Sequence, residues 1–354
     1  MKSEALIVIA LCLLGSTFAL AQEDRVPAQG GGRGRGGRGG QNLPRPPAKD
    51  TVAPDIPGVV AGGTKVQLIK EGFQDAQGAT AGPDGSLLFA ERSANRINKV
   101  GKDGTISTYM ENTSQTNTFV FDPKGRAIGA QWAPARVAVL GPTPTVLADK
   151  FEGHEFGQPK DLIADKKGGV YFTDQLGLFA EGVGPGVYYI KPNGGTIKIA
   201  SDIPRPSGVM LSPDEKTLYV TDSLGTFIKQ ADVQADGSIR NERNFAEMFP
   251  RMPAHTLADG MAIDATGRLY VASYRGVLVF SPQGKQLGSI PIPRQPINIA
   301  FAGPDKKTLY VLGAVFNYRE EIDLFNFIEE TVRHEFGALY QIPMLAEGYK
   351  GRAK

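Results

Sequence analysis

One short phrase recurs six times along this chain, and this repetition constrains its fold more than any other feature. Each copy is a turn rich in Pro, Asp and Gly followed by a short strand-forming run, at a spacing of roughly 40 to 50 residues. The copies end at Glu91, Gln131, Asp174, Asp222, Ser273 and Gly313. One such unit cannot cover both faces of its own sheet, whereas a closed ring of units can.

Further strand-forming segments lie between the copies, at about four strands per unit. Examples are residues 96–100, 187–190, 197–200 and 277–280. This arrangement is typical of propeller blades, so we predict an all-β fold, a six-bladed β-propeller. We expect residues 66–69 to pair with residues 339–342 in the last blade and so close the ring.

One segment near the C-terminus breaks this rhythm. Residues 319–336 contain no turn residue, and Ile322, Phe325, Val332 and Phe336 recur near helical spacing. The pattern predicts one short amphipathic helix inserted in the last blade. Two roles stay open for this helix: packing on the rim of the propeller, or forming a lid over a ligand site.

The N-terminal residues 1–21 have the pattern of a signal peptide. Lys2 precedes an apolar run that reaches Ala19, and Ala19-Leu20-Ala21 is a small-x-small cleavage site. A membrane anchor is the alternative, but the run is near the short limit for a spanning helix. We therefore predict a periplasmic or secreted protein with no transmembrane segment after cleavage.

Residues 22–57 are rich in Gly, Arg and Pro and poor in large apolar residues. Such a segment cannot bury enough surface to offset its ordering entropy, so we predict a disordered linker before a propeller over residues 58–354. A nucleic-acid-binding arm is the alternative. Export argues against it, and we expect no nucleic-acid partner.

Cysteine and histidine side chains, the usual zinc ligands, are few in this chain. Cys12 is the only cysteine and lies inside the predicted signal peptide, while His154, His255 and His334 are the only histidines and show no ligand spacing. Zinc sites built from thiolates or histidines are therefore disfavoured.

A polar residue stands just before each of the six inner strands. Because the units repeat, these residues occupy corresponding places and should converge on the propeller axis. They are Gln77, Asn117, Lys160, Ser207, Asp259 and Asn298. We interpret the set as a ligand site, although any single member could also cap a turn.

These loops resemble the senescence-marker-protein/gluconolactonase family of six-bladed propellers, also called regucalcin-like. PKDLIADKKGGVYFTD, RPSGVMLSPDEKTLYVTDS and ADGMAIDATGRLYVAS are similar to three of its loop-and-strand motifs. The similarity extends from about residue 65 to residue 343. It implies a calcium-dependent lactone hydrolase with a divalent ion held by Glu, Asn and Asp side chains.

Several of the implied ligands differ in this chain. Gln77 stands for the Glu, Lys160 and Ser207 stand for two Asn residues, and only Asp259 is retained. Calcium prefers six to eight oxygen ligands, commonly with more than one carboxylate, and an ammonium group repels it. We therefore expect no resident cation, with Asp259, Gln77 and Ser207 as a remnant site. Calcium or another divalent cation remains the cofactor if the family's site still functions.

Two functions fit these residues. The first is hydrolysis of sugar-acid lactones or related cyclic esters, with Asp259 as the general base and Lys160 as the electrophile. Substrate contacts would then come from Gln77, Asn117, Ser207 and Asn298. The alternative is a non-catalytic propeller that binds a small carbohydrate or a protein partner at the same place. The oligomeric state does not follow from the sequence.

Overall fold

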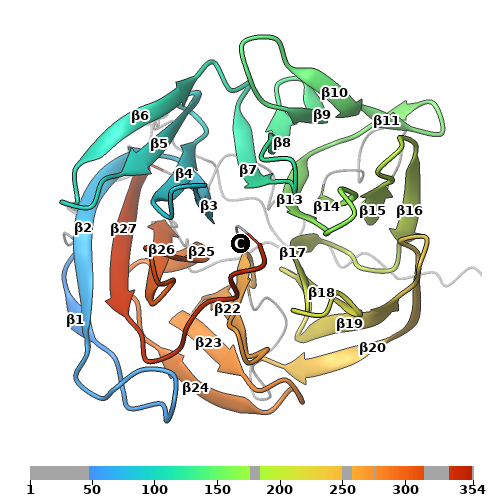
Figure 1. Cartoon of the computed structure of the whole chain (residues 1–354). Helices are drawn as coiled ribbons and strands as arrows, with labels where there is room; N and C mark the ends of the chain where they lie inside the picture. The colour runs from blue at the N-terminus through green and yellow to red at the C-terminus, as the bar shows by residue number, and fades with distance from the viewer. Residues whose placement is uncertain (1–47, 176–183, 249–256, 275, 315–334, 353–354) are drawn as a thin grey trace, which may run out of the picture. The chain divides into compact units, whose positions relative to one another are not determined.

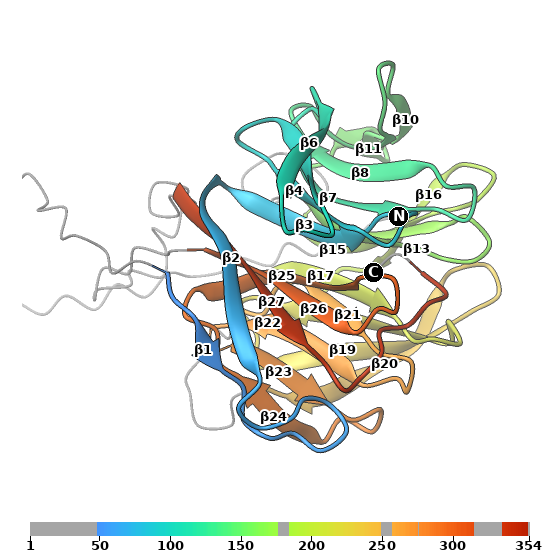
Figure 2. The same cartoon turned by 60° about the vertical axis from the view of Figure 1, so that its left-hand side comes forward.

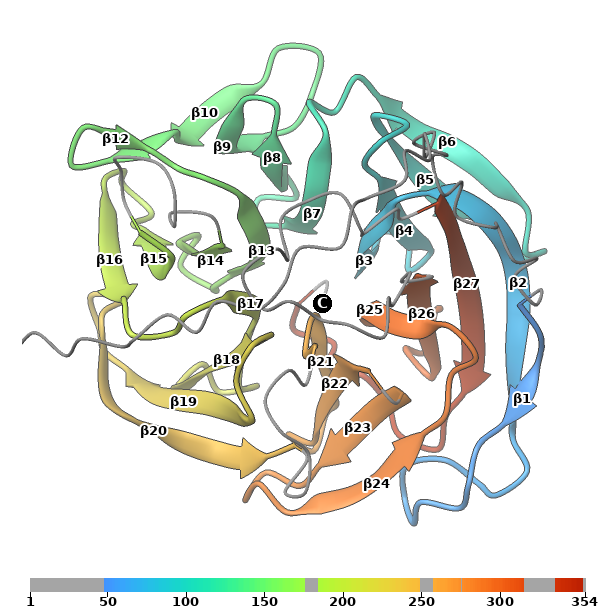
Figure 3. The same cartoon turned by 180° about the vertical axis from the view of Figure 1, so that it is seen from behind.

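The computed structural model of the chain describes residues 48–175, 184–248, 257–274, 276–314 and 335–352. Six antiparallel sheets lie around a central axis in the manner of propeller blades (Figures 1 and 3). The predicted six-bladed β-propeller is confirmed. Within the described residues no helix is present, so none there is long and apolar enough to cross a membrane.

Blades 1 to 3 follow each other along the chain. Their strands are β3 (Ala76–Ala81), β4 (Leu87–Glu91), β5 (Arg96–Val100) and β6 (Ile106–Glu111); β7 (Thr116–Phe121), β8 (Ala127–Trp132), β9 (Ala135–Val139) and β10 (Thr145–Ala148); and β13 (Pro159–Ala164), β14 (Val170–Asp174), β15 (Gly186–Ile190) and β16 (Thr196–Ala200). A small hairpin of β11 (Lys150–Phe151) and β12 (His154–Glu155) separates the second blade from the third.

Blades 4 to 6 complete the ring. Their strands are β17 (Pro206–Leu211), β18 (Thr217–Asp222), β19 (Phe227–Val233) and β20 (Ile239–Glu247); β21 (Met261–Ile263), β22 (Leu269–Ser273), β23 (Gly276–Phe280) and β24 (Gln286–Ile290); and β25 (Gln295–Ala302), β26 (Thr308–Ala314), β27 (Glu335–Pro343), β2 (Lys65–Gln74) and β1 (Thr51–Val52). The last blade thus combines strands from both ends of the described chain.

The closing pair is β2 with β27, which lie side by side in Figure 2. Its register matches Leu68 with Tyr340 and Gln67 with Gln341. The predicted pairing of residues 66–69 with residues 339–342 is confirmed. The edge strand of the last blade therefore comes from the start of the propeller.

The structure moves the expected N-terminal boundary of the propeller. Thr51 and Val52 form β1 on the edge of β2, and Ile56, Val59 and Val60 are buried in an apolar cluster with the last two blades. These apolar side chains bury enough surface to order the segment. Residues 48–57 therefore belong to the propeller rather than to the linker, which we had extended to residue 57.

The repeated turn has a common hydrogen-bonding pattern. In the turn after β7, one carboxylate oxygen of Asp122 accepts hydrogen bonds from the backbone N–H groups of Lys124 and Arg126, and Gly125 has a φ of 75°. Asp264 binds the corresponding N–H groups in blade 5. The Asp therefore fixes the turn, and Gly supplies the left-handed residue that it needs.

These turns define the two ends of the propeller. We call the end that carries the turns between the first and second strand of each blade, such as residues 122–126, the turn end. The opposite end, where the inner strands β3, β7, β13, β17, β21 and β25 begin, is called the site end.

Most of the predicted helix at residues 319–336 lies outside the described residues. The exceptions are Glu335 and Phe336, which the structure assigns to β27. The helical prediction was therefore wrong for these two residues, because the backbone there pairs with β2. The N-terminal residues 1–47, with the predicted signal peptide, also lie outside the described part.

Candidate functional site

The six predicted site residues all lie at the site end, at the start of the inner strands. Five of them are buried, and Asp259, just before β21, is partly buried. Neighbouring blades approach closely here: a Cβ on Gly208 would overlap the backbone oxygen of Asp259. Small residues after the site positions therefore let the inner strands come together around the axis.

Contacts between consecutive blades link the members of this ring. The side-chain amide of Asn117 donates to the backbone oxygen of Lys160 at 2.7 Å, and Ala79 N–H donates to Asn298 Oδ1 at 3.2 Å. The second contact joins the last blade to the first. Each of these side chains is thus positioned partly by the next blade.

Three threonine hydroxyls support the same ring. Thr118 donates to the backbone oxygen of Lys160 at 2.8 Å. Thr173 and Thr221 donate in the same way to the backbone oxygens of Ser207, at 2.6 Å, and of Asp259, at 3.0 Å. Because each hydroxyl comes from the preceding blade, the main chain at these three site positions is anchored on both sides.

An ion pair joins blades 3 and 5 at the site end. Lys160 Nζ lies 3.1 Å from Asp259 Oδ2, with the two side chains only 10% and 16% exposed. Ser207 donates its hydroxyl to the other oxygen, Oδ1, at 2.8 Å. Lys160 Nζ also donates to Gln77 Oε1 from blade 1 at 3.4 Å. Four of the six predicted residues therefore form one connected cluster.

The sequence interpretation missed three side chains beside this cluster. Asp75 Oδ1 accepts a hydrogen bond from Gln77 Nε2 at 3.1 Å, and its Oδ2 lies 2.5 Å from Arg92 Nη2. The Arg92 guanidinium stacks 3.4 Å above the centre of the Trp132 ring. Burial lowers the pKa of Arg92, and the charge of Asp75 opposes that shift. The sequence did contain a signal for Asp75, because it is a charged residue only two positions before the predicted site residue Gln77.

Arg205 is a further basic residue next to the ion pair. It directly precedes β17, and its backbone N–H donates to Asp222 Oδ1 at 3.3 Å. Burial lowers the pKa of its guanidinium, while the charges of Asp259 and Asp222 oppose that shift. Asp259 thus interacts electrostatically with two cationic side chains, Lys160 and Arg205.

This arrangement does not fit a divalent ion at the place that the family resemblance implies. The Lys160 ammonium already binds Asp259 and Gln77, two of the three side chains predicted as remnant ligands. A divalent ion about 4 Å from that ammonium would be repelled by about 8 kcal/mol at an effective dielectric constant of about 20. Among the described residues, no group of three or more His, Cys, Asp or Glu side chains could hold a metal ion.

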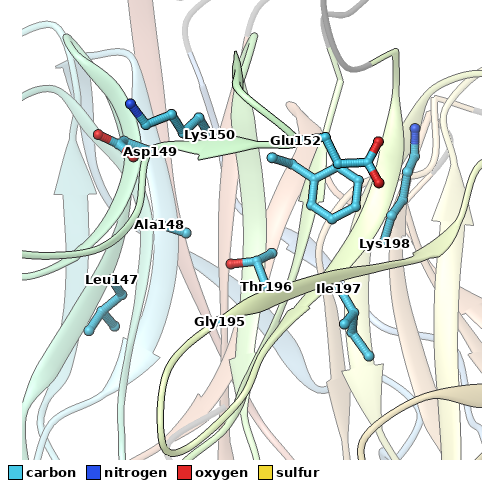
Figure 4. Close-up of a pocket in the computed structure, with 10 residues that line it drawn as sticks. Leu147, Ala148, Asp149, Lys150, Glu152, Gly195, Thr196, Ile197 and Lys198 are labelled. Carbon is cyan, nitrogen blue, oxygen red and sulfur yellow. The ribbon is translucent and has the colours of Figure 1, made fainter.

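A separate cavity of about 680 Å³ lies at the periphery, between blades 2 and 3 (Figure 4). It is lined by residues 147–152 and 195–198, and Glu152 and Lys198 stand on one side of it. None of the axial cluster contributes to its lining. The cavity therefore gives no support to chemistry at the Lys160–Asp259 pair.

Comparisons with known proteins agree with this architecture. The chain is 27% identical over 290 residues to a gluconolactonase of Zymomonas mobilis, covering 73% of this chain and 82% of that protein. It is 37% identical over 137 residues to the lactonase drp35 of Staphylococcus aureus, a match that spans 38% of this chain and 41% of that enzyme.

Solved structures show the same fold at lower identity. A gluconolactonase from Xanthomonas campestris superimposes with a TM-score of 0.66 at 24% identity, covering 86% of this chain and 99% of that one. The calcium-binding protein regucalcin from Agrobacterium tumefaciens gives a TM-score of 0.60 at 17% identity, with coverages of 81% and 98%.

The family model described as the SMP-30/Gluconolactonase/LRE-like region matches residues 75–315, from the first blade to the last. This match includes all six predicted site residues. The chain therefore belongs to the SMP-30/gluconolactonase/LRE-like family.

Proposed function

We propose that this protein hydrolyses lactones of sugar acids or related cyclic esters at the site end of the propeller, without a resident metal ion. Family membership supports lactone hydrolysis as the class of reaction. The observation that carries the finer proposal is the 3.1 Å contact between Lys160 Nζ and Asp259 Oδ2. It joins a base and a fixed positive charge on the axis.

Asp259 is the general base in this proposal. Ser207 and Lys160 each hold one of its carboxylate oxygens, which leaves a second lone pair on each oxygen. The carboxylate takes a proton from water while that water attacks the lactone carbonyl carbon. When the ring C–O bond breaks, Asp259 returns the proton to the leaving oxygen, and a hydroxy acid results.

Lys160 is the electrophilic group. Negative charge develops on the carbonyl oxygen as the tetrahedral intermediate forms, and a fixed ammonium in a water-poor site stabilises that charge. The hydrogen bond to Gln77 and the two donors on its backbone oxygen hold Lys160 in place. The positive charge is therefore in position before the reaction begins.

Asn117 is the predicted substrate contact with a free acceptor. Its Oδ1 is buried and has no hydrogen-bond partner among the described residues, whereas its amide N–H binds the backbone oxygen of Lys160. A buried acceptor without a donor costs about 1–3 kcal/mol. A hydroxyl group of a sugar-derived substrate would remove this cost. Asn298, by contrast, already accepts a hydrogen bond from Ala79.

The decisive experiment measures lactone hydrolysis by the purified protein in EDTA and in added calcium. We expect equal kcat/KM in both conditions, and a loss of about 100- to 10,000-fold in Asp259→Asn, as is usual for a general base. Asp305→Asn, in an exposed turn, is the control and should keep full activity.

Two other results would change the proposal. Activity that EDTA abolishes and calcium restores would show a metal-dependent enzyme. Binding of lactones or carbohydrates without turnover would support the alternative, a non-catalytic propeller that recognises a carbohydrate or a protein partner.

A further inference from the structure

The orientation of the Gln77 amide is fixed by its two neighbours. The carboxylate of Asp75 only accepts hydrogen bonds, and the ammonium of Lys160 only donates them. The amide nitrogen must therefore face Asp75, at 3.1 Å, and the amide oxygen must face Lys160, at 3.4 Å. A glutamate at position 77 would instead place a second carboxylate against Asp75.

Asp75 is itself held by Arg92. Both Nε and Nη2 of Arg92 lie 2.5 Å from Asp75 Oδ2, and Ser93 donates its hydroxyl to the same oxygen at 3.3 Å. The two side chains of the ion pair are only 13% and 3% exposed. Arg92 and Ser93 therefore hold Oδ2 of Asp75, which leaves its Oδ1 facing Gln77.

The chain of contacts returns to the strand that carries Lys160. Arg92 lies flat on Trp132, whose indole N–H donates to the backbone oxygen of Pro159 at 2.9 Å. Pro159 directly precedes Lys160 in β13. Blades 1, 2 and 3 thus contribute to one closed series of contacts. It starts at the Lys160 ammonium, passes through Gln77 and Asp75, and returns by Arg92 and Trp132 to the strand that carries Lys160.

We infer that Gln77 and Asp259 form a binding site for an alkylammonium cation, which Lys160 fills from within the chain, and that Asp75 and Arg92 are positioning residues for this site. The amide oxygen of Gln77 and the carboxylate of Asp259 are its two acceptors. The inference deepens the proposed function and rests on it for the kinetic readout. It explains why the remnant of a metal site keeps such a defined geometry.

The test removes the internal cation and supplies an external one. In Lys160→Ala, we expect methylammonium chloride to restore kcat/KM at least tenfold toward the wild-type value in a saturable way. Calcium chloride at equal ionic strength should restore less than twofold. A larger recovery with calcium than with methylammonium would overturn the inference.

The positioning residues are tested in the same background. Adding Asp75→Asn removes the negative charge that pairs with Arg92 and replaces one of the two acceptor oxygens by a donor, so Arg92 and Gln77 can no longer both be satisfied. We therefore expect it to reduce the methylammonium effect at least fivefold. Asp103→Asn, in an exposed turn, is the matched control and should leave the effect intact. An unchanged methylammonium effect in the Asp75→Asn double variant would remove Asp75 and Arg92 from the site.

A binding readout separates this inference from the proposed function. Methylammonium should raise the Tm of Lys160→Ala but not of the wild type, even when no lactone is hydrolysed. Should Lys160→Ala not fold, the single variants Asp75→Asn and Arg92→Met are compared with their double variant. Each should lower kcat about tenfold with little change in KM, and the double variant should be no worse than either. Additive losses would contradict the inference.

Discussion

At the site end of the propeller, a polar side chain stands at the start of the inner strand in each of the six blades, and four of them form one cluster, whereas the turn end is crossed by the C-terminal segment 344–352. At the turn end, backbone groups dominate. Tyr349 N–H donates to Ile263 O, and Gly348 N–H donates to Lys306 O. Figure 1 shows this red segment running from β27 toward the centre. The two ends thus use different chemical groups.

This difference between the two ends indicates that the turn end contributes to the stability of the ring, whereas the proposed chemistry is confined to the site end. Arg352 binds the backbone oxygens of Leu211 and Ser212 and pairs with Glu215 at 3.1 Å, so the segment reaches from the last blade to blade 4. Such contacts hold blades together but present no base or electrophile to a ligand. The ion pair of Lys160 with Asp259 also joins two blades, but in the proposed function its two charges additionally act on the substrate.

Arg352→Met tests whether the turn end contributes stability alone. The side chain is 6% exposed, and its loss would remove the guanidinium that pairs with the Glu215 carboxylate and donates to two carbonyl groups. We expect the free energy of unfolding to fall by about 3–5 kcal/mol, as for other broken buried pairs. Denaturant titration measures this loss, and kcat/KM of the folded fraction should not change.

Lys350→Met is the control for this variant. Its ion pair with Glu347 is largely exposed, so we expect a change below about 0.5 kcal/mol. A clear loss of kcat/KM in Arg352→Met at unchanged stability would break the division between the two ends.

Asp174, at the site end, tests whether a buried carboxylate there destabilises the folded protein near neutral pH. Burial raises the pKa of Asp174 to about 6, although Gly157 and Gln158 donate backbone hydrogen bonds to it. The folded state then holds this proton more tightly than the unfolded state. The stabilisation is complete below about pH 4 and is lost as the pH rises through about 6, by about 3 kcal/mol in total.

Asp174→Asn removes this titration. Relative to the wild type, the variant should gain about 2–3 kcal/mol in free energy of unfolding between pH 4 and pH 7. Asp103→Asn is the control, because hydrogen bonds from Thr105 lower the pKa of Asp103 and keep its titration below this range. Parallel pH curves for the wild type and Asp174→Asn would contradict the prediction.

Substitution of Asn117 has the smallest expected effect of the three, and it tests whether this residue contacts the substrate at the site end. Asn117→Leu and Thr118→Val each remove one hydrogen bond to the backbone oxygen of Lys160. Only the first also removes the unpartnered acceptor. We expect Asn117→Leu to lower kcat/KM about 5- to 30-fold more than Thr118→Val on a polyhydroxylated δ-lactone.

The matched substrate is an unsubstituted δ-lactone of the same ring size. On this compound the two variants should behave alike, because no hydroxyl group is present to donate to Asn117. An equal loss for both variants on the hydroxylated lactone would show that Asn117 acts only through Lys160.

The sequence predicted the blades and the ring of site residues because both depend on repetition. The blades could be predicted because Asp or Ser at the turns and alternating residues in the strands are local patterns. The site residues could be predicted because equal spacing places Gln77 and Asn298 at corresponding positions, even though they are far apart in the chain. The same argument placed Lys160 and Asp259 at corresponding positions.

Features that occur once were missed. The stacking of Arg92 on Trp132 joins two different blades and has no counterpart in the repeat. The N-terminal boundary was placed too late because the segment as a whole is rich in Gly, Arg and Pro, whereas its single large apolar side chains, such as Ile56, are buried against the last two blades. The signal peptide, which would direct export, stays a prediction.

The pairing of β2 with β27 has a consequence for the order of events during biosynthesis. Ala79 binds Asn298 across the joint between blades 1 and 6, and β2, which directly precedes blade 1, can pair in the last blade only when β27 has been made. A ribosome-bound chain that has not yet made β27 (Glu335–Pro343) therefore has no closed ring, although Asp75 can already bind Gln77 within blade 1. Closure of the six-bladed ring around the site residues is therefore a late step that waits for β27.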